Sequence, residues 1–467
     1  MTDLAAAGVA ETARLVREGE VSARGAVEAA LARIDERDRD LNAFSRVLAD
    51  EAIAEAEARD ATLASGASPG PLHGVPIAIK EEIDVAGTVT TFGGEGNSTP
   101  AAVDAEVVTR LRAAGAVIVG KTTMPEFGAF PFTESVSRGI TRNPWDRNRT
   151  PGGSSGGTAA AVASGMVPAG MGGDGGGSIR IPSASCGLFG LKPQRGRVTT
   201  APQSHLWFAL GTAGPLTRTV RDSAIVYDVI RGNVEGDLYT AGGDDSFVDA
   251  VGRAPGRLRI GWSIKSVTIG VAPDPAHVRA VEDAARLLTD LGHDVRQVDP
   301  HYPDPTAAFV PQFFAGIRHE AQHVEHYDRL ERRTRETCRL GAWVTPKVVE
   351  WALGQTEKVS TKANRIFQEV DVLLTPAIAH RPPPVGRLDG VGTIQSSLRA
   401  MPSIAYAAIW NVAGNPAASV PCGTAPDGLP LAVQLVGRTD DEATLFSLSA
   451  QIESARPWPL LAPVAAA

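Results

Sequence analysis

The chain has 467 residues, of which 43% are hydrophobic and 21% charged, so it can bury the core of one large domain or of two to three ordinary ones. Lys and Arg total 45 and Asp and Glu total 53, which gives a net charge of −8. Nucleic-acid-binding proteins carry an excess of basic residues, so this charge disfavours a nucleic-acid partner. Three distant cysteines, an odd number with no Cys-x-x-Cys pair, disfavour a disulfide framework or a cysteine-based zinc site and fit a reducing compartment.

The N-terminus and the apolar stretches predict a soluble, cytoplasmic protein without a membrane partner. The first twenty residues carry Asp3, Glu11 and Glu18 and have no apolar run flanked by basic residues, so we expect no secretory signal. The longest charge-free stretch, residues 150–173, is about as long as a membrane span but is interrupted by Gly, Ser and Pro.

In the first half of the chain, the predicted secondary structure changes from helices alone to alternating strands and helices. Residues 2–65 have apolar positions at helical spacing, and Ser22 is placed to cap the second of two or three helices. From residue 75 onward, short β-rich runs alternate with helical ones, which predicts a layered α/β sheet. The predicted elements are a strand at 75–80, a helix at 103–114, a strand at 116–120 and an Ala-rich helix at 158–164.

The second half continues the alternation, with no internal repeat and no clear linker, so one large domain is the simplest interpretation. The apolar runs on either side of Pro426-Asp427-Gly428 predict a hairpin. The remaining predicted elements are a helix at 219–231, strands at 258–263 and 294–298, a helix at 276–291, a helical region at 302–370, a strand at 371–376 and a C-terminal helix from about 440.

Three short patterns suggest functions that their surroundings do not support. His319-Glu320-Ala321-Gln322-His323 matches the zinc-protease helix, but its neighbourhood is charged on nearly all sides and fits a polar helix face. Residues 170–175 match G-x-G-x-x-G within a run where eleven of 27 residues are Gly, and no acidic residue follows at the expected distance for a ribose. Residues 153–157 match the nucleophile elbow, with Ser155 as nucleophile, but follow a turn instead of a strand.

A fourth pattern has three parts in a specific order: Lys80 at the end of VPIAIK, TPGGSSGG at 150–157, and GGDGGGSIRIP at 172–182. Together they resemble the signature of the amidase signature family, hydrolases of carboxamides with a Ser–cis-Ser–Lys triad. Further stretches that share the resemblance are 74–87, 120–128, 141–145, 187–193, 214–222 and the late GNPAASVP and DGLPLAVQLVG.

The resemblance implies the family's fold, an α/β domain with a mixed, mostly parallel central sheet and helices on both faces. We expect residues 1–70 to form N-terminal helices and 71–235 the signature core with the catalytic loops. Residues 236–400 would form a variable, substrate-side region, and 401–467 would complete the sheet and end in a helix.

The resemblance also implies the site residues. Ser178 corresponds to the nucleophile, Ser154 to the bridging serine after a cis Gly153–Ser154 peptide, and Lys80 to the general base. The supporting positions are Ser155, Asp174 and Arg180, and the oxyanion hole corresponds to the backbone N–H groups of Gly175, Gly176, Gly177 and Ser178. Two departures lie outside the triad: the family commonly has Ser-Asp-Thr where this chain has Gly173-Asp174-Gly175, and often Asn in place of Thr123.

These residue types suit the chemistry. A lysine serves as a base only when neutral, so its pKa must fall from about 10.4 toward roughly 7 to 8, as burial in an apolar setting allows. The apolar run before Lys80 predicts such a setting. Glu81 and Glu82 would oppose the fall in the lysine pKa if they faced the same pocket, but side-chain alternation along the strand directs at least Glu81 to the other side. Preorganised backbone donors at an oxyanion contribute about 2.7–4 kcal/mol each.

The predicted activity is hydrolysis of the C–N bond of carboxamides through a serine acyl-enzyme, without metal or organic cofactor, by a monomer or homodimer. Aromatic residues indicate either core or an apolar pocket for aryl or alkyl amides, with esters and carbamates as further substrates; they are Phe127, Phe130, Phe132, Trp207, Phe208, Phe313, Phe314 and Trp343. One alternative is the glutaminase subunit of a tRNA-dependent amidotransferase, but residues 320–370 of this chain do not resemble the glutamine-binding stretch of that subunit. The other alternative is a zinc metalloprotease that uses His319, Glu320 and His323.

Overall fold

The computed structural model describes residues 4–203 and 205–463, which form one α/β domain around an eleven-stranded mixed sheet. The strand order across the sheet is β1-β3-β2-β6-β8-β7-β12-β13-β11-β9-β10. The strands are β1 Phe44–Val47, β2 Pro76–Lys80, β3 Val117–Thr122, β6 Ala169–Asp174, β7 Phe189–Lys192, β8 Thr212–Thr217, β9 Arg259–Trp262, β10 Asp294–Gln297, β11 Val372–Pro376, β12 Ala417–Thr424 and β13 Pro430–Val436. A separate small hairpin pairs β4 (Glu134–Ser135) with β5 (Gly139–Ile140).

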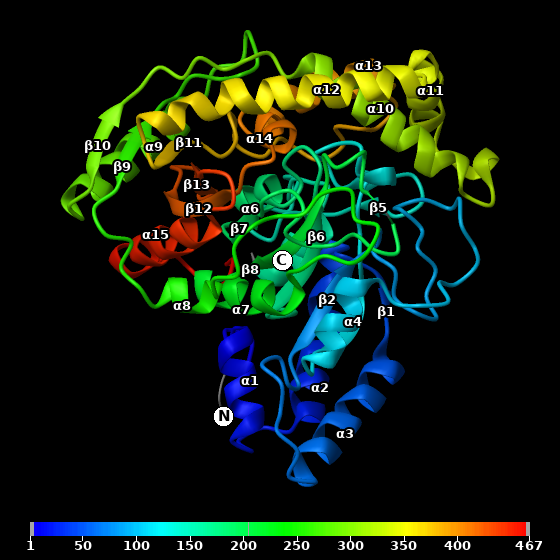
Figure 1. Ribbon diagram of the computed structural model, residues 1–467. Helices are drawn as coiled ribbons and strands as arrows, with labels where there is room; N and C mark the ends of the chain where they lie inside the picture. Colours follow the sequence, from blue (N-terminus) through cyan, green and yellow to red (C-terminus); the bar gives the residue numbers. More distant parts are fainter. Residues whose placement is uncertain (1–3, 204, 464–467) are drawn as a thin grey trace.

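Helices surround this sheet (Figure 1). In chain order they are α1 Val9–Arg17, α2 Ala23–Leu41, α3 Ala49–Ala64, α4 Glu106–Ala113, α5 Gly156–Ala163, α6 Arg180–Cys186, α7 Val220–Ile230, α8 Phe247–Val251, α9 Pro275–Asp290, α10 Thr306–Gln322, α11 Arg332–Leu340, α12 Pro346–Ala363, α13 Thr393–Ile404, α14 Ala408–Ala413 and α15 Glu442–Ala455. Figure 1 shows α10 to α13 as an arch at one end of the molecule and α1 to α3 at the other.

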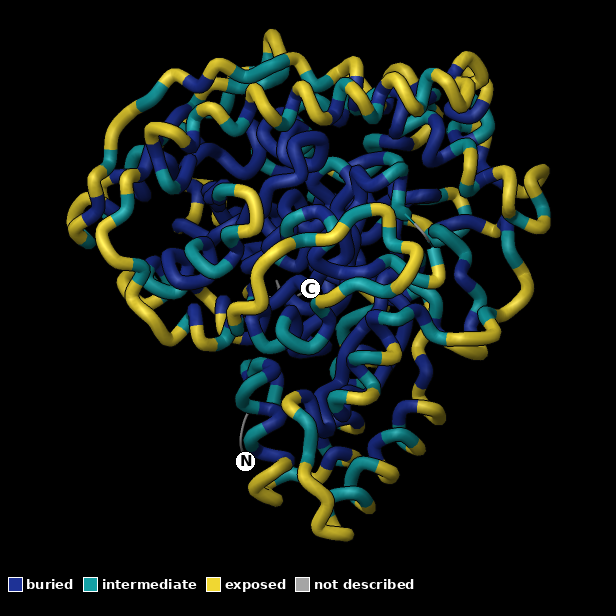
Figure 2. Tube along the Cα trace, in the orientation of Figure 1, coloured by how far each residue is buried: buried dark blue, intermediate teal, exposed yellow. Residues whose placement is uncertain are grey.

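Strand β2 shows how both faces of the sheet are covered. Ile77 and Ile79 pack in a core cluster with residues of α4, α7, α9 and α15, whereas Ala78 between them packs with α2 and α5. Because successive side chains on a strand point to opposite faces, helices on both faces bury the strand completely, as predicted. Figure 2 shows the resulting buried layer between the exposed outer turns of the helices.

The prediction that the sheet is mostly parallel is wrong. The parallel pairs are β2 with β3 and β6, and β9 with β10 and β11. All other neighbours in the described sheet are antiparallel, from β1–β3 and β6–β8 through β7, β12 and β13 to β11. The mostly parallel sheet was an implication of the family resemblance, since alternation of strands and helices along the chain predicts layers but not strand direction. In the structure, β6, β8, β7, β12 and β13 pair antiparallel in the middle of the sheet.

One of those strands, β6, lies in the Gly-rich run that contains the G-x-G-x-x-G match, where the sequence predicts no strand. Its glycines serve close packing: a Cβ at Gly170 would lie 2.6 Å from Thr158 Cγ2, and a Cβ at Gly172 would lie 2.7 Å from Ser155 Oγ. Both contacts come from α5 or the residue just before it, so glycine lets this buried helix approach the strand. A strand that needs glycine for packing lacks the β-branched composition that predicts strands.

Most other predicted elements are confirmed. Ser22 caps α2, with Oγ accepting a hydrogen bond from the N–H of Gly25 at 2.9 Å. The hairpin around Pro426-Asp427-Gly428 is the antiparallel pair β12–β13, and the helical region 302–370 divides into α10, α11 and α12. In the described part of the chain, no helix combines the length and apolar character needed to cross a membrane.

Candidate active site

Lys80 is the last residue of β2 and is almost completely buried, with 1% exposure. Its Nζ donates a hydrogen bond to Ser154 Oγ at 2.8 Å. Two of the three predicted triad residues, separated by 74 positions in the chain, are therefore in direct contact.

The surroundings of Lys80 differ from the apolar setting expected from the sequence. Lys80 Nζ lies 2.9 Å from Glu82 Oε1, and this carboxylate is itself largely buried. Glu81, by contrast, forms an ion pair with Arg138 at 3.1 Å, so the expectation that it turns away from Lys80 is confirmed. The absence of a side chain at Gly173 makes room for Glu82, because a Cβ there would lie 2.3 Å from Glu82 Oε1.

The loop before α5 presents Ser154. The Gly153–Ser154 peptide is cis, as the resemblance implies. A Cβ at Gly153 would lie 2.9 Å from the backbone of Phe132, so only glycine fits there. The next residue, Ser155, joins two loops: its Oγ donates to Gly173 O at 3.2 Å, and its N–H donates to Ser178 O at 3.3 Å.

Ser178 lies just before α6, at the wall of a cavity, with 9% exposure. The structure describes both serines and records no hydrogen bond between the hydroxyls of Ser154 and Ser178; the backbone bond from Ser155 joins the two loops instead. A change in the Ser178 rotamer when substrate binds is compatible with this arrangement, since hydrogen bonds of catalytic groups often tighten only in the complex.

The predicted oxyanion donors divide into two groups. The N–H of Gly177 donates to Asp174 Oδ1 at 2.7 Å, so it is already engaged. Within residues 4–203 and 205–463, the N–H groups of Gly175, Gly176 and Ser178 have no hydrogen-bond partner. Gly176 also lines the same cavity as Ser178. These three donors remain available to a developing negative charge.

Comparison with known proteins identifies the family of the chain: the family model described as Amidase matches residues 25–446. The chain belongs to the amidase signature family. The Mycobacterium tuberculosis protein AmiB2 is 48% identical over 459 residues, which cover 98% of each chain. The solved structure of a 6-aminohexanoate cyclic dimer hydrolase has a TM-score of 0.93 and 30% identity, covering 99% of this chain and 100% of that one.

A bacterial aryl acylamidase of the same family has a TM-score of 0.87 and 28% identity, covering 98% of both chains. These relatives agree with the chemistry that the Lys80 region suggests. This amidase is thus an enzyme that hydrolyses carbon–nitrogen bonds of amides other than peptides.

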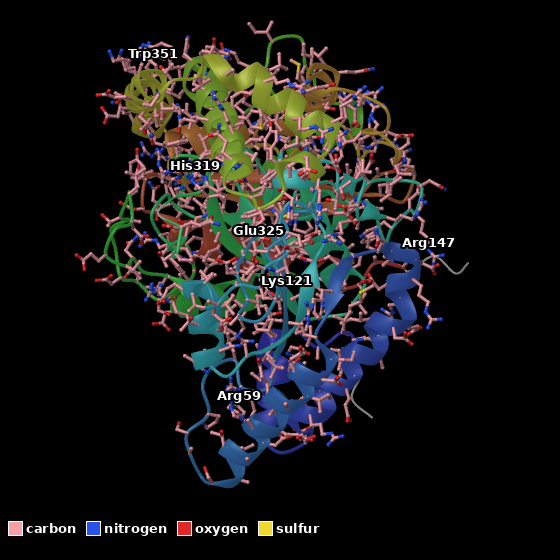
Figure 3. All side chains as sticks on the ribbon, turned by 90° about the vertical axis from the view of Figure 1, so that its right-hand side faces the viewer. Arg59, Lys121, Arg147, His319, Glu325 and Trp351 are labelled. Carbon is pink, nitrogen blue, oxygen red and sulfur yellow. The ribbon has the colours of Figure 1, made fainter. Side chains whose placement is uncertain are left out.

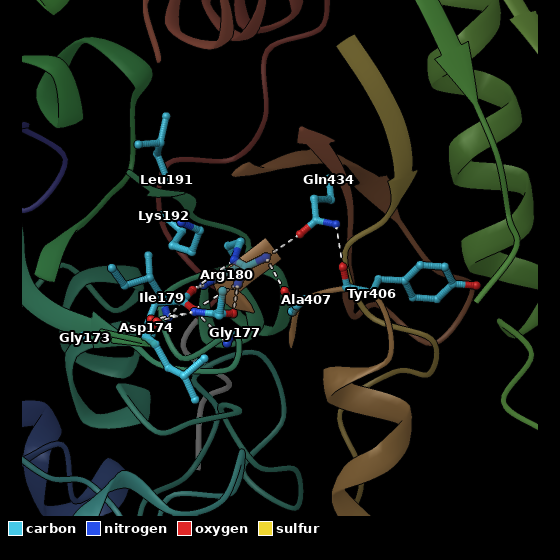
Figure 4. Close-up of polar contacts among 12 residues, drawn as sticks. Gly173, Asp174, Gly177, Ile179, Arg180, Leu191, Lys192, Tyr406, Ala407 and Gln434 are labelled. Carbon is cyan, nitrogen blue, oxygen red and sulfur yellow. Dashed lines mark hydrogen bonds and ion pairs between the residues drawn. The ribbon is translucent and has the colours of Figure 1, made fainter. Parts of the chain in front are cut away.

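A fully buried ion pair supports the Ser178 loop of the amidase (Figure 4). Arg180 Nη2 lies 2.9 Å from Asp174 Oδ1, and Arg180 Nε donates to Oδ2 at 3.0 Å. Besides Gly177, the N–H of Ile179 also donates to this carboxylate, at 3.2 Å. Burial alone would raise the pKa of Asp174, but the charge and hydrogen bonds of Arg180 hold it well below its usual range.

Two partners in this network were missed by sequence reasoning. Arg180 also donates to Asn411 Oδ1 at 2.7 Å and to Gln434 Oε1 at 2.8 Å, residues 231 and 254 positions away. Neither belongs to a motif quoted for the site, although Gln434 lies within the late DGLPLAVQLVG stretch. The network ties the predicted nucleophile loop to α14 and β13.

We expect Asp174→Ala to lower the free energy of unfolding at pH 7 by about 3–5 kcal/mol, because it leaves the Arg180 guanidinium buried without its counter-ion. Urea denaturation measures this. Asp283→Ala, which breaks an exposed pair with Arg286, should cost no more than about 1 kcal/mol. Similar losses in both variants would contradict a stabilising role for the buried pair.

The cavity beside Ser178 has a volume of about 510 Å³ and an apolar wall. Of the aromatic residues predicted to line a pocket, Phe130, Trp207, Phe313 and Phe314 do so, together with Phe309, which was not predicted. The others lie elsewhere: Phe127 and Phe132 are buried outside its lining, Phe208 stacks on His205, and Trp343 is an exposed surface residue.

In the amidase, the three short patterns that suggested different functions lack the geometry that those functions require. His319 and His323 are exposed at the end of α10, and among the described residues no three His, Cys, Asp or Glu side chains are grouped to hold a metal ion, so the zinc interpretation has no support. The G-x-G-x-x-G match covers strand β6 and not a strand-to-helix turn. Ser155, the candidate of the nucleophile elbow, donates its hydroxyl proton to Gly173 O.

Proposed function

We propose that this amidase hydrolyses carboxamides with an apolar alkyl or aryl acyl group through an acyl-enzyme on Ser178, and that esters and aryl carbamates with the same acyl side are further substrates. Lys80, Ser154 and Ser178 are the proposed triad. The contact between Lys80 Nζ and Ser154 Oγ supports this assignment.

In the proposed reaction, Ser178 Oγ attacks the carbonyl carbon while its proton moves to Ser154 Oγ, whose own proton moves to neutral Lys80. The carbonyl oxygen becomes negatively charged and accepts hydrogen bonds from the N–H groups of Gly175, Gly176 and Ser178. The proton then returns through Ser154 to the leaving nitrogen, and the C–N bond breaks. Water attacks the ester on Ser178 by the same relay and releases the acid.

Glu82 adds a role that the sequence did not predict. Its carboxylate, 2.9 Å from Lys80 Nζ, stabilises the ammonium that forms when Lys80 takes a proton, and the neutral amine that starts each cycle must form against the same attraction. A buried ammonium without this partner would carry a large desolvation cost. We therefore assign Glu82 as a positioning residue that holds Lys80 against Ser154.

The apolar lining of the cavity beside Ser178 is the reason for proposing an apolar acyl group. Within the described residues no charged side chain lines it, and its wall is formed by residues such as Phe309, Phe313 and Ile409. Apolar surface buried there contributes about 25 cal/mol per Å² to binding. The ammonium and carboxylate of glutamine would find no counter-charge in this cavity. This disfavours the glutaminase alternative, although one structural neighbour, with 28% identity and a TM-score of 0.81, belongs to the glutamyl-tRNA(Gln) amidotransferase of Thermotoga maritima.

We expect an apolar anilide to be hydrolysed with a kcat/KM at least tenfold that of glutamine, because about 0.8 kcal/mol per buried CH₂ favours the apolar acyl group. The test compares purified enzyme on a butyryl anilide, the corresponding primary amide, an aryl carbamate and glutamine. Activity confined to glutamine or to small polar primary amides would overturn the proposed substrate class.

A further inference from the structure

A second cavity, of about 200 Å³, is a neighbour of the apolar cavity, because Trp207 lines both. We call it the polar chamber. Its polar lining residues are Asn97, Gln203, His205, His319, Glu320 and His323. Trp207 fits tightly between two glycines, since a Cβ at Gly175 or Gly316 would lie 2.8 or 2.7 Å from the indole ring. One cavity is thus apolar, whereas its neighbour is rich in hydrogen-bonding groups.

Three separate segments build the polar chamber, and hydrogen bonds hold two of them together. Glu325, just beyond α10, accepts a hydrogen bond from the N–H of Thr99 at 2.9 Å, and the N–H of His326 donates to Gly96 O at 2.8 Å. Figure 3, in which the right-hand side of Figure 1 faces the viewer, labels His319 and Glu325. The chamber is therefore anchored where the end of α10 meets the loop that contains Asn97.

The chamber reaches close to the triad. Phe92, in its wall, stacks on Phe127 with ring centroids 5.5 Å apart. The residue after Phe127, Gly128, lines the apolar cavity, and a Cβ there would lie 3.0 Å from Ser154 Oγ. A short series of contacts through Phe92, Phe127 and Gly128 thus leads from the wall of the polar chamber to the Ser154 hydroxyl, which returns the proton to the leaving nitrogen.

Glu320 is the only acidic side chain among the described lining residues of the chamber, and the Trp207 indole N–H lies close to its carboxyl group. Burial is the main cause that raises the pKa of Glu320 to about 8, and the nearby charge of Glu82 adds to it, whereas the Trp207 indole N–H and Lys80 oppose it. The indole Nε1 completes no hydrogen bond among the described residues. Glu320 and the Trp207 indole thus face each other in the wall of the chamber without a hydrogen bond of ordinary geometry between them.

We propose that the polar chamber binds the amine side of the substrate and selects leaving groups that carry a second, protonated amino group, which Glu320 receives. This inference rests on the proposed function, because the leaving nitrogen must lie near Ser154 while the acyl group occupies the apolar cavity. A bound ammonium displaces the proton of Glu320 and forms a charge-assisted hydrogen bond with its carboxylate.

Several other groups of the chamber suit the same ligand. Partial burial lowers the pKa of His205 and of His319 below the ordinary imidazole value. Neutral His319 offers an acceptor nitrogen, whereas His205 Nδ1 already accepts the N–H of Phe208 at 3.2 Å, so neutral His205 presents an Nε2–H donor. The amide oxygen of Gln203 is a further acceptor, and Asn97 Oδ1, which accepts the N–H of Glu325 at 3.2 Å, has one lone pair left for the ligand. His319 and His323 are exposed, so the chamber opens to solvent and gives the released amine a way out.

The test is a matched pair of benzamides, one of pentylamine and one of 1,5-diaminopentane acylated at one end. We expect the wild-type enzyme to prefer the diamine amide by about tenfold or more in kcat/KM, the range of a hydrogen bond to a charged group. Glu320→Gln should bring that ratio close to one, whereas Glu350→Gln, at an exposed position of α12, should leave it unchanged. A ratio that survives Glu320→Gln would overturn the inference.

Binding without turnover separates the inference from the proposed function. Calorimetry with 1,5-diaminopentane and with pentylamine is carried out on Ser178→Ala and on the Ser178→Ala/Glu320→Gln double variant, after their melting temperatures show that both are folded. We expect the diamine to bind the single variant about tenfold more tightly than the double variant. If both amides resist hydrolysis but the diamine binds through Glu320, the proposed function fails and the chamber assignment stands; equal binding to both variants refutes the assignment.

Discussion

Replacing Ser178 by alanine is expected to lower kcat by about 10⁴-fold or more, because without the nucleophile only binding and the oxyanion donors remain. The hydroxyl makes no recorded hydrogen bond within the described residues, so the melting temperature should stay close to that of the wild type. Steady-state kinetics on the best amide measures the effect, and mass spectrometry of quenched enzyme should detect the acyl group on the wild type only.

Ser183→Ala is the matched control for this variant. Ser183 lies on α6, five positions beyond Ser178, is fully buried and has no recorded partner for its hydroxyl. Its loss should leave kcat within about twofold, since it removes no reacting group and no hydrogen bond. Turnover that persists in Ser178→Ala would end the acyl-enzyme proposal.

Replacing Lys80 by alanine is expected to lower kcat by about 10³-fold or more, because the proposed relay loses its proton acceptor. The same change leaves Glu82 buried without its cation, so lost activity alone would not separate chemistry from damage to the fold. The double variant Lys80→Met/Glu82→Gln removes the whole pair and should be folded but equally inactive. Recovery of activity in the double variant would show that Lys80 acts only through structure.

Lys121→Met provides the comparison with another buried lysine. Lys121 lies on the neighbouring strand β3, and its Nζ donates to Ile83 O at 2.8 Å instead of to a serine. Burial lowers the pKa of Lys121 to about 8. This variant should keep most of the wild-type kcat in its folded fraction, which would show that burial of a lysine near the site is not sufficient for activity.

Local sequence patterns predicted the elements whose residues have a high propensity for the structure that they form. The capped helix after Ser22, the strand that ends at Lys80 and the hairpin around Pro426-Asp427-Gly428 have the residues that these elements favour. Strand β6 was missed because its glycines are required for the approach of α5, which overrides strand propensity. The zinc-like pattern misled for a related reason: a five-residue match does not say what else lies near it.

The site shows the same division. The resemblance named Lys80 and Ser154, and the fold brings these two into contact. Sequence could not indicate that Glu82 turns back toward Lys80, because that depends on the space left by Gly173 on β6. Nor could it indicate that Arg180 reaches Gln434, 254 positions away, since no local pattern links α6 to β13.

The sequence by itself determined the family, the types of most elements and the residues proposed to react, since each is encoded in short motifs and local periodicity. The tertiary structure alone decided the antiparallel order of most strands, the carboxylate beside Lys80, and the placement of an apolar and a polar cavity that share Trp207. Those features arise from contacts between segments far apart in the chain, and the free energy of such contacts depends on the whole path of the backbone.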